Sequence, residues 1–271
     1  IYSVIFVKKF CLTVVIMVLT VVKKKKIILS AIICLALVVL ITTMSASGAY
    51  NVFYGYSVKK LPIYSVDTEE KKIAISFDCA WGTDYTDQLL EIMKKQNVKC
   101  TFFMVEFWTE KNSEYVKKID AAGHEIGTHS STHPYMSKLS KDKMIAELKS
   151  SSEKITAITG KKVELFRPPY GDYNDLLIDT AAELGLYPIQ WSVDSLDWKN
   201  LSAAEITKRV VGKAAAGDIV LFHNQGLHTA EALDGIITEL KEKGFRFVPI
   251  GELIYRDNYK MLPDGKQKSC N

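Results

Sequence analysis

The sequence has few cysteines, few histidines and, in its first 50 residues, no acidic side chain. Five cysteines occur among 271 residues, and Cys11 and Cys34 fall in the N-terminal segment. The other three, Cys79, Cys100 and Cys270, are widely spaced, which excludes a disulfide framework. With 48% apolar and 24% charged residues, the chain is too apolar to be disordered and can bury one sizeable core.

The lack of acidic residues at the N-terminus accounts for the formal charge of +4. Six lysines lie in the first 50 residues, at positions 8, 9 and 23–26. Residues 51–271 therefore hold 29 basic and 31 acidic residues, a formal charge of −2. Because the body of the chain is nearly neutral, we expect no nucleic-acid-binding face.

An apolar run follows the lysine cluster. It covers 18 residues, 27–44, and small residues follow at 45–49. These parts match a secretory signal with cleavage before Tyr50. The run is also just long enough to span a bilayer as an uncleaved anchor, and a buried helix of the globular domain is the third alternative. Lysines ahead of the run place the rest of the chain outside the cytoplasm, so we predict export.

Downstream of residue 70, short apolar runs alternate with amphipathic stretches, and several of the latter end at a glycine. This alternation is typical of parallel β/α units in one α/β domain, as a barrel or an open sheet. The strand-like runs are 73–77, 100–105, 125–128, 165–167, 187–191, 219–222 and 245–249. The helical stretches are 84–96, 112–122, 141–159, 173–184, 203–216 and 229–242.

These patterns divide the chain into four parts. Residues 1–49 are a signal peptide or membrane anchor, and 50–70 are a polar lead-in. Residues 71–255 form the α/β domain, and 256–271 are expected to be a polar, loosely packed tail.

Polar side chains follow the strand-like runs one after another. The carboxyl ends of parallel strands meet at one rim of a barrel, where active sites form. We therefore expect these side chains to lie close together: Asp78, His129, His133, Arg167, Asp194, Asp197 and His223.

Two of these side chains form a pair, His129-Ser-Ser-Thr-His133. One helical turn brings residues four apart to the same side. Neutral imidazoles favour Zn, Co or Ni, and two of them leave positions open for water and substrate. Three of only five histidines follow strand-like runs, which favours metal binding over two solvated loop histidines.

Five motifs in order resemble the polysaccharide deacetylase family, the NodB-homology domain of carbohydrate esterase family 4. The resemblance covers about 71–255, which makes this part the expected catalytic domain. It implies a distorted (β/α) barrel of about seven parallel strands. The motifs are Ser76-Phe77-Asp78-Cys79, His129-Ser-Ser-Thr-His133, Arg167-Pro-Pro-Tyr-Gly171, Asp194-Ser-Leu-Asp197-Trp198 and Leu221-Phe-His223.

The resemblance implies roles for the catalytic groups. Asp78 would be the general base that takes a proton from water, and Arg167 would keep it ionised and oriented. His223 would be the general acid that protonates the departing amine. Asp197, in preference to Asp194, would hold His223 protonated.

The resemblance also implies how the substrate is held. A divalent metal ion, Zn in first place and Co or Ni as alternatives, would be bound by His129 and His133. The backbone N–H of Tyr170 would face the oxyanion. Leu221 would line a pocket for the acetyl methyl group. Trp81 and Trp198 would form walls against the sugar rings.

One position departs from the family pattern. Most members carry a second, metal-ligating Asp after the catalytic one, whereas this chain has Cys79, a form that resembles the PdaB-like, sporulation-associated branch. Cys79 could complete a Cys/His/His zinc site as a thiolate. Alternatively, the two histidines could bind metal weakly, with water or Asp84 completing the shell. The third alternative is a metal-free protein with little or no activity.

The resemblance and the export prediction together imply a metal-dependent hydrolase. It would remove N-acetyl groups from amino sugars of cell-wall polysaccharide, foremost peptidoglycan, and act as a monomer. Two other classes stay open: a glycan-binding relative without catalysis, and a hydrolase of another acyl amide or ester.

Overall fold

The computed structural model describes residues 24–25, 29–30, 32–43 and 59–270, in two units that divide after Lys59. In the first unit, the described residues up to position 43 are helical and exposed. Among the described residues, no helix is both long and apolar enough to cross a membrane. The expected cleavage site at 45–49 lies outside the described residues, as do residues 27–28, 31 and 44 of the apolar run before it.

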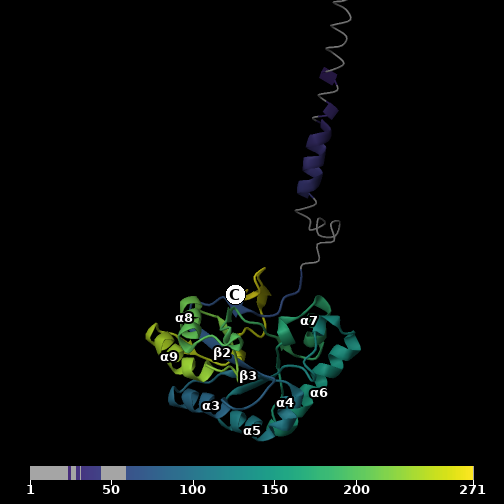
Figure 1. Ribbon diagram of the computed structural model, residues 1–271. Coiled ribbons are helices and arrows are strands. Elements are labelled where there is room, and N and C mark those ends of the chain that lie inside the picture. Colours follow the sequence, from purple (N-terminus) through teal and green to yellow (C-terminus); the bar gives the residue numbers. More distant parts are fainter. Residues whose placement is uncertain (1–23, 26–28, 31, 44–58, 271) are drawn as a thin grey trace, which may run out of the picture. The chain divides into compact units, whose positions relative to one another are not determined.

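A sheet of parallel strands forms the centre of the second unit (Figure 1). Its path runs β6-β5-β4-β3-β2-β8-β7, and β9 pairs with the start of β2. All pairings along this path are parallel, so the carboxyl ends of the strands share one rim. The strands are β2 (Lys72–Cys79), β3 (Thr101–Met104), β4 (Glu125–Thr128), β5 (Leu165–Phe166), β6 (Tyr187–Pro188), β7 (Val193–Asp194), β8 (Ile219–His223) and β9 (Arg246–Phe247).

The connection between the two edge strands shows that the sheet is rolled. Only residues 189–192 separate β6 from β7, although these strands lie at opposite ends of the path. Seven strands in a flat sheet would put them about 29 Å apart, whereas this connection spans at most about 18 Å. The sheet therefore curves into the distorted barrel that the sequence predicted. Of the run predicted at 187–191, only Tyr187–Pro188 is a strand; the rest belongs to this bend, and β7, which follows it, was not predicted.

Helices surround the sheet, and most follow the predicted stretches (Figure 1). The bounds of α6 and α9 coincide with the prediction, while α4 and α10 were not predicted. A capping box between Ser202 and Glu205 begins α8, and left-handed Gly160 ends α6. The helices are α3 (Thr86–Lys95), α4 (Glu106–Lys111), α5 (Ser113–Ala121), α6 (Lys141–Thr159), α7 (Asp175–Glu183), α8 (Ala203–Lys213), α9 (Thr229–Glu242) and α10 (Ile250–Leu253).

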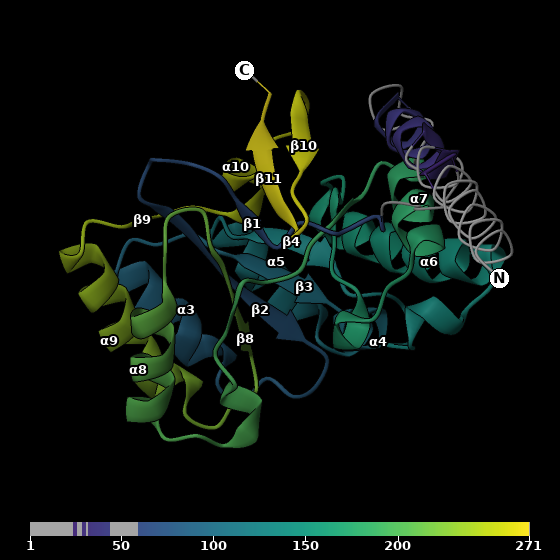
Figure 2. The same cartoon turned by 90° about the horizontal axis from the view of Figure 1, so that it is seen from above.

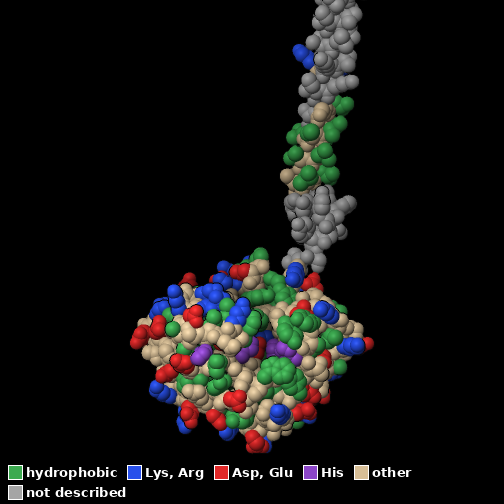
Figure 3. All heavy atoms as spheres, in the orientation of Figure 1, with side chains coloured by type: hydrophobic (Ala, Val, Ile, Leu, Met, Phe, Trp, Pro, Cys, Tyr) green, Lys and Arg blue, Asp and Glu red, His purple; other side chains and the backbone are tan. Residues whose placement is uncertain are grey.

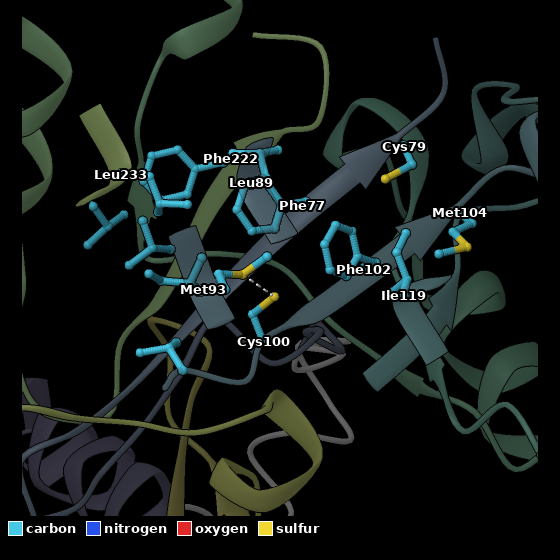
Figure 4. Close-up of a cluster of buried hydrophobic side chains, with 14 of the residues drawn as sticks. Phe77, Cys79, Leu89, Met93, Cys100, Phe102, Met104, Ile119, Phe222 and Leu233 are labelled. Carbon is cyan, nitrogen blue, oxygen red and sulfur yellow. Dashed lines mark hydrogen bonds between the residues drawn. The ribbon is translucent and has the colours of Figure 1, made fainter. Parts of the chain in front are cut away.

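The central strand β2 separates the hydrophobic layer from the barrel interior. Successive side chains of a strand point to opposite faces. On the inner face, Ser76 and Asp78 contact the side chain of Arg167. On the outer face, four side chains join the buried layer between sheet and helices: Ile73, Ile75, Phe77 and Cys79. Figure 4 shows two of them, Phe77 and Cys79, within this layer.

The lead-in and the tail together form a second, three-stranded sheet (Figure 2). Its strands are β1 (Ser65–Val66), β10 (Tyr259–Met261) and β11 (Lys266–Ser269). The expectation of a loosely packed tail is therefore wrong. Gln267 is fully buried, and its side-chain amide exchanges hydrogen bonds with the backbone of Tyr255. Paired backbone and one buried amide order this polar segment without an apolar run that would mark it in sequence.

A close approach at Gly217 generates a stability prediction. Gly217 has φ +81°, and a Cβ there would lie 1.8 Å from the carbonyl oxygen of Val66 in β1. Gly217→Ala should lower the free energy of unfolding by about 2 kcal/mol. In Gly212→Ala, the matched control in α8, the new Cβ meets nothing within 4 Å, so stability should rise by about 0.5–1 kcal/mol. Urea unfolding measures both, and equal effects would contradict the packing argument.

Candidate active site

A cavity of about 600 Å³ opens at the carboxyl rim of the barrel. Figure 3 shows histidine side chains across the middle of this hollowed face, with hydrophobic side chains around them. Most residues singled out from the sequence line this cavity: Asp78, Trp81, His129, His133, Tyr170, Asp194, Trp198, Leu221 and His223. Arg167 and Asp197 are fully buried and bond to lining side chains.

A buried ion pair fixes Asp78. Arg167 donates from Nη1 to Asp78 Oδ1 at 2.7 Å, and from Nη2 to Ser76 Oγ and to the carbonyl of Gln190. The guanidinium also lies 4.2 Å from the centroid of the Phe103 ring. Burial alone would raise the pKa of Asp78, but the charge and the hydrogen bond of Arg167 hold it below its usual value. Asp78 is therefore ionised at neutral pH.

The backbone carbonyl of Arg167 orients the ring of His129. His129 Nδ1 lies 2.7 Å from the carbonyl oxygen of Arg167, which can only accept. In the neutral ring Nδ1 then carries the proton and Nε2 has a free lone pair. His129 Nε2 lies 3.5 Å from Asp78 Oδ2. Burial is the main cause that lowers the pKa of His129, so the neutral form prevails.

A strained loop presents His133. Ser130 and His133 have φ values of +71° and +59°, and His133 N donates to Ser130 Oγ. Glu147 on α6 anchors the loop by accepting from the backbone N–H groups of Ser131 and Thr132. Burial lowers the pKa of His133 to about 4, so its ring is neutral at pH 7. Two neutral imidazoles therefore meet at the rim, with ring centroids 4.9 Å apart.

The structure does not bring Cys79 to these histidines, which argues against the first of the three alternatives, a Cys/His/His site. As the outward neighbour of Asp78, Cys79 lies in the hydrophobic layer and is fully buried (Figure 4). Burial raises the pKa of its thiol well above the usual value, so it is not a thiolate. Asp84 is engaged elsewhere, because its carboxylate accepts from the amide of Gln225.

The remaining donors fit a metal ion only in part. His129 and His133 offer neutral nitrogens, and Nδ1 of His133 is buried without a partner among the described residues. Within the described parts of the chain, no group of three or more His, Cys, Asp or Glu is arranged to hold a metal ion. Two imidazoles without a third side-chain ligand favour weak binding over a closed structural site.

A second paired group lies beside Asp78. Strands β2 and β8 pair in a register that sets Asp78 against His223. His223 Nδ1 lies 2.8 Å from Asp197 Oδ1, while Asp197 Oδ2 accepts from the backbone N–H of His223 and the hydroxyl of Thr229. Burial would lower the pKa of His223, but the hydrogen bond and charge of Asp197, with the charges of Asp78 and Asp194, raise it above its usual value.

The other residues expected from sequence have distinct surroundings. Asp194 lines the cavity, but its side chain accepts from the backbone N–H of Leu196. Leu221 is buried in β8. Trp81 and Trp198 line the cavity and are 66% and 55% exposed. Tyr170 has left-handed backbone, with φ +59°.

Sequence reasoning missed the residues that hold these groups in place. Ser76 and Gln190 bind Arg167, Thr229 binds Asp197, and Glu147 holds the histidine loop. Ser76 carried a signal, because a polar residue on the same face of a strand as Asp78 needs a polar partner. The other three come from distant elements and carry no local pattern.

Fold and site define a (β/α)-barrel protein with an ionised carboxylate and a raised-pKa imidazole side by side in one cavity. General acid–base catalysis uses such a pair of groups.

Comparison with known proteins identifies the family of this chain. The family model for polysaccharide deacetylase matches residues 65–189. A peptidoglycan-N-acetylglucosamine deacetylase of Bacillus cereus is 39% identical over 196 residues, which cover 70% of this chain and 92% of that protein. The YlxY protein of Bacillus subtilis is 36% identical over 198 residues, 73% of this chain, and the match spans 62% of its own length. The chain belongs to the polysaccharide deacetylase family.

A solved relative bears on activity. The structure of a carbohydrate esterase family 4 pseudoenzyme of Bacillus anthracis matches with a TM-score of 0.69 at 36% identity, covering 77% of this chain and 72% of that one. A mutant of that protein with restored enzymatic activity matches with the same TM-score. The family thus includes members with the fold but without activity.

The Asp197–His223 pair generates a pH prediction. Because the folded-state pKa of His223 lies above its unfolded value of about 6.5, the pair stabilises the fold fully below that pH and loses this contribution as pH rises through the folded-state pKa. Asp197→Asn should lower the pKa of His223 and destabilise more at about pH 5.5 than at about pH 9. NMR titration and urea unfolding measure these effects. Asp194→Asn is the control with the smaller expected shift, and a loss independent of pH would contradict the pairing.

The Arg167–Asp78 pair generates a stability prediction. Arg167→Met leaves a buried carboxylate without its partner and should cost about 3–5 kcal/mol of unfolding free energy. Lys161→Met is the control, because its partner Asp120 forms a pair at the surface worth under about 1 kcal/mol. Similar losses of unfolding free energy in the two variants would contradict the claim that the buried pair stabilises the fold more than a surface pair.

Proposed function

We propose that this protein hydrolyses the N-acetyl groups of amino sugars in cell-wall peptidoglycan. The observation that carries the proposal is the register pairing of Asp78 with His223 at one cavity, with opposite pKa shifts. A hydrolase of this kind needs an ionised base and a protonated acid at the same pH. The B. cereus relative, named as a peptidoglycan-N-acetylglucosamine deacetylase, supports the choice of substrate.

The base and the acid divide the proton transfers. Asp78, ionised and held by Arg167, accepts a proton from the water that attacks the acetamide carbon. His223, kept protonated by Asp197, donates a proton to the amide nitrogen as the C–N bond breaks. The products are acetic acid, which ionises in water, and a free amino sugar.

The cavity walls suit an N-acetylated sugar. Leu221 offers an apolar surface to the acetyl methyl group, and Trp81 and Trp198 offer ring faces for sugars. The N–H of Tyr170 is assigned to the oxyanion, in a turn whose left-handed backbone is set between Pro169 and Gly171.

A metal ion would be held by His129 and His133, with Zn first and Co or Ni as alternatives. When bound, such an ion supplies Lewis acidity and a more acidic water. The absence of a third side-chain ligand among the described residues predicts lower affinity than that of a three-ligand site.

We further propose that the protein acts outside the cytoplasm. The lysine cluster and apolar run at the N-terminus support export, and a peptidoglycan substrate requires it. A role in sporulation rests on the resemblance of the Cys79 motif to the PdaB-like branch.

A glycan-binding protein without catalysis is the second candidate. It is favoured by the incomplete ligand set and by the B. anthracis relative described as a pseudoenzyme. The two candidates share the cavity and differ in whether acetate is released.

Acetate release from muropeptides and N-acetylglucosamine oligomers, with and without added Zn or Co, tests the proposal. Asp78→Asn and His223→Gln should each lower kcat by about 10²–10³. His228→Gln is the control, because His228 pairs with Glu231 and does not line the cavity, and it should keep full activity.

Binding to purified peptidoglycan, measured alongside, separates the two candidates. No acetate from any substrate under any metal, with binding retained in His223→Gln, would reject the hydrolase and support the binding protein. Equal rates in wild type and Asp78→Asn would reject the assigned base.

A further inference from the structure

The two histidines of the site are oriented by different means. His129 is fixed by a hydrogen bond from Nδ1 to the carbonyl of Arg167. His133 lacks this, because its Nδ1 is buried without a partner among the described residues. Ring orientation in such histidines is ordinarily set by a hydrogen bond from the second nitrogen. Something else must therefore hold the ring of His133.

Aromatic rings provide the contacts around His133. Its ring packs edge-on against His129 and, on another side, against Tyr170, with centroids 4.5 Å apart at 69°. Tyr170 in turn stacks on Tyr135, with centroids 4.4 Å apart at 17°. Nζ of Lys138 lies 4.4 Å from the centroid of the Tyr135 ring. A continuous column thus runs from Lys138 through two tyrosines to His133.

The column is held at its base by bonds between two segments distant in sequence. Asp172, two residues after Tyr170, accepts from the backbone N–H and the hydroxyl of Ser137, two residues after Tyr135. Asn174 donates to the carbonyl of Ser137. Because both flanking segments are tied at Ser137, the stacking of Tyr135 on Tyr170 is a built arrangement, not a chance surface contact.

We propose that Tyr135 is a positioning residue that, through Tyr170, fixes the ring of His133 in the site. Tyr135 contacts Tyr170 and does not line the cavity. Its stacking restricts Tyr170, which left-handed backbone places between it and His133. Without Tyr135, Tyr170 can tilt away and the ring of His133 gains rotational freedom. The consequence for hydrolysis rests on the proposed function, while the effect on His133 does not.

NMR of histidine ring ¹⁵N signals, on metal-free protein in chelator, tests this. In Tyr135→Ala the ring signals of His133 should shift or broaden, while those of His129 stay in place because Arg167 holds that ring. Tyr135→Phe keeps the stack and should restore the wild-type signals. Tyr135 is 49% exposed, so its truncation leaves the core intact, and thermal unfolding checks this.

Tyr115→Ala is the matched control. This ring also carries a lysine, with Nζ of Lys118 at 4.8 Å, but it lies on α5 and does not line the cavity. It should leave the His133 signals unchanged. Unchanged His133 signals in Tyr135→Ala, or equal changes in His129 or in Tyr115→Ala, would overturn the positioning role.

Kinetics provide a second readout. Tyr135→Ala should lower kcat/KM for acetate release about ten-fold, with Tyr135→Phe within about two-fold of wild type. If wild type releases no acetate from any substrate, the proposed function fails, and the NMR comparison still decides the role of Tyr135.

Discussion

The buried ion pair between Arg167 and Asp78 is the interaction on which the site depends. Either charge alone in the barrel interior would carry a desolvation cost of several kcal/mol, which the pairing offsets. Arg167 holds Asp78 with its guanidinium and His129 with its backbone carbonyl. One residue thus orients both the carboxylate and an imidazole of the site. Ser76 in β2 and Gln190 in the connection between β6 and β7 accept from the other guanidinium amine, Nη2.

This pairing exists only because the sheet is rolled. Arg167 follows β5 and Asp78 lies in β2, with β4 and β3 between them in the sheet. Across a flat sheet they would be about 14 Å apart, beyond the reach of an arginine side chain. In the curved sheet, Nη1 of Arg167 reaches Oδ1 of Asp78 at 2.7 Å across the barrel interior. The short bend between β6 and β7 enforces that curvature. The site therefore forms only when the barrel closes.

Two neighbouring groups then acquire opposite character. Asp78 faces cationic and imidazole groups that favour its ionised form, whereas the carboxylate of Asp197 favours the protonated form of His223. Because Asp78 and His223 are register partners, each also stabilises the charge of the other. One cavity therefore holds an ionised carboxylate beside an imidazole that favours its protonated form.

The sequence by itself determined the alternation of strands and helices, because hydrophobic periodicity follows from which faces are buried. It also determined which polar residues meet at the rim, since parallel strands place their carboxyl ends together. Because side chains alternate along a strand, Cys79 is expected on the same face of β2 as Phe77 and on the opposite face from Asp78. The place of Cys79 in the family motif, next to the catalytic Asp, suggested a metal ligand instead. Only the tertiary structure decided the burial of that thiol, the order of residues 259–269, and the contacts of Thr229, Glu147 and Tyr135. These depend on backbone pairing and on side chains from distant elements, and no local pattern of residues encodes such contacts.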